Sequence, residues 1–194
     1  LLARKQGIGE REDLPQEETR EYLGLIICPA SLVYNWENEI RRFAPSLSVV
    51  TVTGTAAVRR EKIRSGEGDI LLTSYDLLKR DVEEYQGFLF QNTVIDEAQN
   101  IKNYTTQAAK AVKAVRSRQR FALTGTPIEN SLSELWSIFD FLMPGILNSN
   151  KQFRTRYEQP IAASQDERAA SRLRKMIRPY ILRRVKSEVL RELP

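Results

Sequence analysis

The chain has 194 residues, a net charge of +5 and a hydrophobic fraction of 41%, values typical of a soluble globular protein with one substantial core. The absence of histidine excludes histidine-based acid–base catalysis and histidine metal ligands. The single cysteine, Cys28, excludes a zinc site built from several thiolates, and a lone thiol is typical of a reducing compartment. No apolar run approaches the roughly 20 residues that a membrane span needs, so we expect no membrane partner.

The first residues have the character of a fragment. Leu1–Gln6 resembles the end of a helix whose beginning is missing. Residues 9–21 follow with six acidic residues, two arginines and a proline, a composition that predicts a solvated connection.

From residue 23 to about residue 148, short apolar runs alternate with helical patterns. Strands are expected at Leu23–Cys28, Ser48–Val52, Asp69–Thr73, Val94–Asp96 and Phe121–Leu123. The first helix is expected from Ser31 as its cap, with Leu32, Trp36, Ile40 and Phe43 as its apolar face. Further helices are expected at Ala56–Arg64, through Leu77, Leu78 and Val82, at Thr105–Val115, and from a capping box at Ser131–Glu134 to Pro144-Gly145. The alternation predicts an α/β fold with a doubly wound parallel sheet flanked by helices.

After about residue 148 the alternation stops. Phe153, Tyr157 and a helix over Arg168–Ile177 indicate an all-helical extension. From Ser171 to the last residue, eight Lys or Arg residues stand against two Glu. Pro179 is expected to interrupt the helix and leave residues 180–184 extended.

Polar residues follow four of the expected strands. They are Pro29, Thr73-Ser74, Asp96-Glu97 and the stretch Thr124–Thr126. Each alone is an ordinary strand end, but the carboxyl ends of parallel strands share one edge of a sheet, where ligands bind. The four together predict a functional site.

The sequence Asp96-Glu97-Ala98-Gln99 resembles a Walker B box, and Leu123-Thr-Gly-Thr-Pro127 resembles motif III of the Swi/Snf-type ATPases of helicase superfamily two. The run from Asp96 to Asn103 is most similar to bacterial members, with Gln99 in place of the usual histidine. The resemblance covers Leu23 to Pro194. It implies that residues 1–148 are part of a RecA-like ATP-binding lobe, and that residues 149–194 lead toward a second RecA-like lobe of the parent chain.

The resemblance also implies the cofactors ATP and Mg²⁺ and a set of catalytic residues. Asp96 is expected to hold Mg²⁺ and Glu97 to polarise the attacking water, a division that suits two adjacent carboxylates and a hard cation. Gln99 and the hydroxyls of Thr124 and Thr126 are expected to sense the γ-phosphate.

Two other segments resemble the DNA-contacting motifs of the family. Pro29-Ala-Ser31 matches motif Ia and Thr73-Ser74-Tyr75 matches motif Ib, and both are expected to hold phosphates of double-stranded DNA. DNA-bound proteins are expected as further partners.

A P-loop requires Gly-Lys-Ser/Thr, and no lysine in this chain follows a glycine. We therefore interpret the chain as a fragment, inactive alone, of an ATP-driven translocase on duplex DNA, cytoplasmic and nucleoid-associated if bacterial. Two alternatives stay open at this point. One is a non-catalytic DNA-binding lobe, and the other is an RNA helicase of the same superfamily, which shares the Asp-Glu box.

Overall fold

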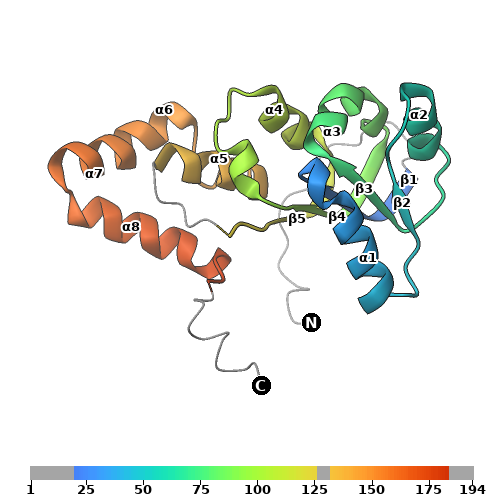
Figure 1. The fold of residues 1–194 in the computed structure, drawn as a ribbon. Helices are drawn as coiled ribbons and strands as arrows, with labels where there is room; N and C mark the ends of the chain where they lie inside the picture. The colour runs from blue at the N-terminus through green and yellow to red at the C-terminus, as the bar shows by residue number, and fades with distance from the viewer. Residues whose placement is uncertain (1–19, 126–131, 184–194) are drawn as a thin grey trace, which may run out of the picture.

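A computed structural model describes residues 20–125 and 132–183, and these residues form a parallel sheet flanked by helices, with a helical extension (Figure 1). The strands are β1 (Arg20–Cys28), β2 (Val49–Thr51), β3 (Ile70–Ser74), β4 (Phe88–Ile95) and β5 (Ser117–Ala122). All pairings are parallel, and the order across the sheet is β2-β3-β1-β4-β5. The predicted doubly wound α/β fold is confirmed.

The α-helices that follow the strands are α1 (Val33–Phe43), α2 (Ala56–Arg64), α3 (Tyr75–Asp81), α4 (Gln107–Ala114) and α5 (Leu132–Leu142). The short helical turns are η1 (Ala30–Leu32), η2 (Val82–Tyr85) and η3 (Ala98–Ile101). The extension contains α6 (Asn150–Phe153), the π-helical turn η4 (Arg154–Glu158), α7 (Gln159–Ser164), α8 (Glu167–Ile177) and the 3-10 turn η5 (Arg178–Tyr180).

The sheet is buried on both faces because its strands carry apolar side chains at successive positions. In β1, Leu25 and Ile27 pack into the core that α3 and α4 cover. Ile26 and Cys28 point to the opposite face, where α1 supplies Val33 and Ile40. This arrangement explains why the strands read as continuous apolar runs rather than alternating ones.

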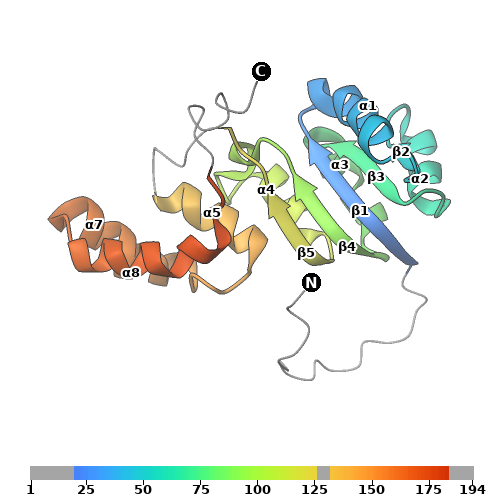
Figure 2. The same ribbon diagram turned by 90° about the horizontal axis from the view of Figure 1, so that it is seen from below.

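Helix α5 belongs to two hydrophobic clusters. Its Ile138 and Phe141 pack into the core beneath the sheet, whereas Leu135, Trp136 and Phe139 pack against α6–α8. Both ribbon views show α5–α8 extending beyond the β5 side of the sheet (Figures 1 and 2). The extension is helical as expected, and Phe153 and Tyr157 are buried in this second cluster. The domain boundary expected at residue 148 stays a prediction. The packing connects the sheet and the helical extension through α5, which contributes to both clusters.

Three local predictions were wrong. Ser31 does not cap α1, because it lies within the turn η1, and α1 starts at Val33 with no side-chain cap. Phe43 is not on the buried face of α1, since it is 71% exposed with Arg42 over its ring. Tyr180 is not extended, since the chain continues from α8 as η5 and becomes extended at Ile181. The predicted Ser131 cap and Arg184 lie outside the described residues.

Candidate functional site

The site lies where the carboxyl ends of β1, β3, β4 and β5 meet. The register aligns Cys28 of β1 with Ser74 of β3, and Ile95 of β4 with both Ile27 and Ala122. The residues that follow these strands are therefore neighbours, as the sequence predicted. Chain connections leave β1 and β4 in opposite directions across the sheet, so the edge between these strands is a topological switch point, where α/β proteins bind ligands.

Asp96 is held at this edge by four hydrogen bonds, one of which its own backbone N–H donates to the oxygen of Ile27 at 2.8 Å. The indole Nε1 of Trp36 on α1 donates to Asp96 Oδ2 at 2.8 Å, and the backbone N–H of Glu97 donates to Oδ1 at 2.8 Å. The phenol of Tyr75 donates to the backbone oxygen of Asp96 at 2.6 Å. The carboxylate is half-buried and its orientation is defined from two sides.

Glu97 has a left-handed backbone conformation, with φ 51° and ψ 57°. Such a conformation costs a non-glycine residue on the order of 1–2 kcal/mol, and here η3 follows immediately and stabilises it. The next residue, Ala98, donates its backbone N–H to the oxygen of Leu123 at 2.9 Å. The carboxylates of Asp96 and Glu97 have different hydrogen-bond partners.

Gln99 connects Glu97 to the segment after β5. Its Nε2 donates to Glu97 Oε2 at 2.5 Å, and its Oε1 accepts from the hydroxyl of Thr124 at 3.0 Å. Glu97, Gln99 and Thr124 thus form one continuous hydrogen-bonded chain. Thr126 lies outside the described residues, and its predicted role is not addressed.

The two expected DNA-contacting segments differ in accessibility. Pro29 is half-buried and Ser31 is exposed, so this turn is open to a phosphate. Thr73, Ser74 and Tyr75 are 0%, 3% and 7% exposed, and their hydroxyls point inward.

The buried hydroxyls of the second segment have structural partners. Ser74 accepts from the backbone of Leu77 and caps α3, and Tyr75 donates to Asp96. Within the described part of the chain, the hydroxyl of Thr73 has no hydrogen-bond partner. These hydroxyls are buried and turned toward the protein in this structure, and the expected contact of the three residues with DNA phosphates stays a prediction. DNA contact by the segment's backbone stays a prediction.

Cys28 and Tyr75, which lie beside Asp96 at this edge, both have raised pKa values. Burial and, to a smaller extent, the negative charge of Asp96 together raise the pKa of the Cys28 thiol to about 12. Burial, followed by the charge of Asp96, also raises the pKa of the Tyr75 phenol well above its ordinary range. Both groups stay protonated near neutral pH, so the phenol can donate its hydrogen bond to Asp96.

A magnesium ion fits this donor set in one specific way. Among residues 20–125 and 132–183 there is no cluster of three or more acidic, cysteine or histidine side chains able to enclose a metal. Mg²⁺ usually keeps several waters and binds through one or two carboxylates together with substrate phosphates. Each Asp96 oxygen accepts one hydrogen bond and retains a second acceptor position. The site is thus suited to a nucleotide-bound Mg²⁺ rather than to a resident ion.

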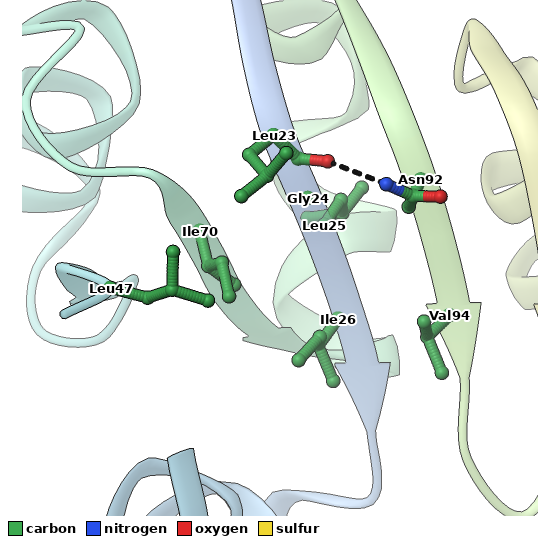
Figure 3. A pocket seen from close by; sticks show the side chains of 8 residues that line it. All are labelled: Leu23, Gly24, Leu25, Ile26, Leu47, Ile70, Asn92 and Val94. Atoms are coloured by element: carbon green, nitrogen blue, oxygen red, sulfur yellow. Dashed lines mark hydrogen bonds between the residues drawn. The ribbon is translucent and has the colours of Figure 1, made fainter. Parts of the chain in front are cut away.

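A separate pocket of about 250 Å³ lies on the sheet face beside α1. It is lined by apolar side chains of β1, β3 and β4 together with Leu47, and Asn92 donates to the oxygen of Leu23 at 3.2 Å (Figure 3). The pocket lies along the sheet rather than at its carboxyl edge and contains no ionisable group. We therefore place the functional site at the Asp96 edge and not in this pocket.

The sequence did not predict two contacts of Asp96, those with the side chains of Trp36 and Tyr75. Trp36 was assigned to the apolar face of its helix. The available signal was chemical, since a partly buried indole N–H needs an acceptor. The sequence could not show that the acceptor lies 60 positions away.

Comparisons with known proteins agree with the geometry. A family model described as "SNF2-related domain" matches residues 10–194. The chain is 42% identical over 189 residues to TATA-binding protein-associated factor MOT1 of Saccharomyces cerevisiae, covering 91% of this chain and 10% of that protein. It is 39% identical over 201 residues to the uncharacterized ATP-dependent helicase MG018 of Mycoplasma genitalium, covering 100% of this chain and 19% of that protein.

A solved structure is also similar. The Sulfolobus solfataricus SWI2/SNF2 ATPase core in complex with dsDNA superimposes with a TM-score of 0.79 at 43% identity, over 88% of this chain and 36% of that one. The chain thus spans between about a tenth and a fifth of the length of the two relatives. In the part of the chain that is described, no helix has the length and apolar character to cross a membrane.

Proposed function

Because the chain belongs to the family of SNF2-related domains, we propose that it is the portion of an ATP-dependent double-stranded DNA translocase that carries the Walker B and motif III parts of the ATPase site. One observation carries this proposal. The two adjacent carboxylates of Asp96 and Glu97 lie at the switch point of a RecA-like sheet, and each is held by a different neighbouring element.

Asp96 is the residue we assign to magnesium. Bound Mg²⁺ would supply positive charge that neutralises the phosphate oxygens of ATP. The protein's own contribution is orientation: Trp36 and the Glu97 backbone fix the carboxylate so that its remaining acceptor positions face the edge of the sheet.

Glu97 is the residue we assign to the attacking water. Gln99 engages one carboxylate oxygen, Oε2, and a water can approach the other. From there the carboxylate can accept the proton that the water loses on attack. Gln99 holds Glu97 in position and links it to Thr124, which follows β5. We extend the same role to Thr126 on the basis of the sequence resemblance.

Duplex DNA is the partner that we propose for the Pro29–Ser31 turn. The exposed hydroxyl of Ser31 can contact phosphate without sequence preference, and the exposed basic residues of α8, Arg172, Arg174 and Lys175, can add to the attraction. The similarity to the SNF2 core in complex with dsDNA supports this partner, and the similarity to MOT1 supports a DNA-bound protein as a second one. The second RecA-like lobe of the parent would face the same edge, and a cytoplasmic, nucleoid-associated location would follow in a bacterial source.

Substitution of the two carboxylates in the full-length parent tests the proposal. Glu97→Gln keeps the shape but removes the charge that accepts the proton, and we expect DNA-stimulated ATP hydrolysis to fall by about 10²–10⁴-fold while nucleotide binding persists. Asp96→Asn is expected to weaken the magnesium-dependent part of nucleotide binding. Near-normal rates in both variants would refute the assignment and favour a non-catalytic DNA-binding lobe. Stimulation by RNA in place of duplex DNA would favour the RNA helicase.

A further inference from the structure

The hydrogen bond between Trp36 and Asp96 connects α1 to the loop that follows β4. Trp36 lies in the first turn of α1, and its ring packs at the border of the cluster between α1 and the sheet. Its indole N–H, the side chain's single polar group, donates to Asp96 Oδ2 at 2.8 Å across a sequence separation of 60 residues.

The other donor to this carboxylate cannot perform the same task. Glu97 N–H is adjacent to Asp96 along the chain, and it moves whenever Asp96 moves. A bond from the next residue restrains the side-chain torsion but does not locate the carboxylate relative to the rest of the protein. The bond from Trp36 does, because α1 packs on β2 and β3 and is therefore held by strands other than the one that leads to Asp96.

The second tryptophan shows what a structural indole contact looks like in this fold. Trp136 of α5 donates to the neutral backbone oxygen of Asn148 at 3.1 Å and packs edge-on against Tyr104. Trp36 instead donates to an ionisable carboxylate at the functional edge. A hydrogen bond to a charged acceptor is shorter and roughly twice as strong as a neutral one, and it fixes the orientation of the acceptor.

We propose that Trp36 is a positioning residue for Asp96, holding one carboxylate oxygen so that the remaining acceptor positions stay directed at the nucleotide-bound metal. The proposal rests on the assignment of Asp96 to magnesium. It also gives α1 a mechanical connection to the metal site: the Pro29–Ser31 turn immediately precedes α1, so a displacement of this turn by a bound phosphate backbone shifts Trp36 and with it the Asp96 carboxylate.

The bond itself is tested by NMR on the isotope-labelled 194-residue chain, which contains two tryptophans and therefore gives two indole N–H signals. Trp36→Phe and Trp136→Phe assign one signal each. In Asp96→Ala we expect the Trp36 signal to move upfield and its exchange with solvent to quicken about tenfold, because the charged acceptor is lost. The Trp136 signal stays in place and serves as the internal control for folding. An unchanged Trp36 signal in folded Asp96→Ala would overturn the proposal without bearing on the ATPase assignment.

The consequence is tested in the full-length parent with Trp36→Phe, matched by Trp136→Phe. Loss of a residue that orients a metal ligand typically changes metal affinity or activity by 10–100-fold. We expect Trp36→Phe to raise the magnesium concentration for half-maximal ATPase about tenfold, with the KM for Mg-ATP at saturating magnesium changed less than about twofold. Trp136→Phe should leave both values unchanged.

The two proposals fail in different ways. Full activity of Asp96→Asn would refute the proposed function. An inactive Asp96→Asn together with a Trp36→Phe variant of normal magnesium dependence would leave the function standing and refute the role of Trp36. Equal loss of activity at every magnesium concentration in Trp36→Phe would also refute it, since that result indicates a purely structural contribution.

Discussion

A buried hydroxyl connects the loop that carries the two carboxylates to α5, and its removal has a predictable cost. Ser137 Oγ donates to the backbone oxygen of Ile101, the last residue of η3, at 2.6 Å. Both residues are 0% exposed, and Lys113 Nζ approaches the same hydroxyl at 3.5 Å. The contact connects positions 36 residues apart.

The expected effect of Ser137→Ala follows from three contributions. A buried carbonyl left without its donor costs roughly 1–3 kcal/mol. Alanine has a higher helix propensity than serine, which offsets about 0.5 kcal/mol of that loss within α5. Removal of a single oxygen creates no cavity of consequence. We therefore expect the free energy of unfolding to fall by about 0.5–2.5 kcal/mol.

Urea unfolding of the 194-residue chain, followed by circular dichroism, measures this difference. With an m-value of about 2 kcal/mol/M, a loss near the middle of the range lowers the midpoint by roughly 0.7 M. Ser65→Ala is the matched control, because the Ser65 hydroxyl also donates to a backbone oxygen, that of Lys62 at 3.1 Å, but at an exposed position. Water replaces the lost donor there, so we expect a change within about 0.5 kcal/mol.

Equal midpoints for Ser137→Ala and Ser65→Ala would refute this reasoning, since burial of the carbonyl would then make no difference. An altered m-value in Ser137→Ala would mean that the extension unfolds separately from the sheet. In that case α5 would not join the two clusters as tightly as its packing indicates.

Two further predictions concern the chain alone. At mildly alkaline pH, Cys28 should react with a thiol-specific disulfide reagent at least about 100-fold more slowly in the native chain than in urea, because burial raises its pKa to about 12 and keeps it protonated. Since the folded pKa lies above the unfolded one, the stability that this thiol contributes is complete below the unfolded pKa and declines as the pH rises toward the folded value. Equal reaction rates in the two states would contradict the burial. Calorimetry of the chain with Mg-ATP should show no saturable binding at micromolar concentration, because no Gly-Lys pair is present to hold the phosphates, and a Kd near ~1 μM, about 8 kcal/mol of binding, would refute this.

The sequence predicted the sheet well because its strands carry a simple signal. Strands buried on both faces appear as uninterrupted apolar runs, and all five residues of β3 are buried. The prediction for β5 missed its first four residues, since the strand starts at Ser117 and ends at Ala122, one residue before the expected end. The first four of its six residues, from Ser117 to Arg120, are polar on this edge strand and therefore carry no apolar signal.

The sequence predicted which residues lie together at this edge but not the hydrogen bonds that connect them. The strand ends placed Asp96, Glu97 and Thr124 together because parallel strands share an edge, and the register confirms this neighbourhood. The burial of Thr73 and Ser74 was not predictable from residue type, since a hydroxyl suits a phosphate contact and a helix cap equally well. The bond from Trp36 depends on the position of α1 over the sheet, which only the packing of the core determines.

The two carboxylates, although adjacent in sequence, are held by opposite sides of β4. Asp96 accepts hydrogen bonds from Trp36 of α1 and Tyr75 of α3, the helices that follow β1 and β3. Glu97 is bound through Gln99 to Thr124, which follows β5. The left-handed backbone conformation of Glu97 lies between these two sets of contacts. A movement on the α1 side therefore acts first on Asp96, and a movement beyond β5 acts first on Glu97.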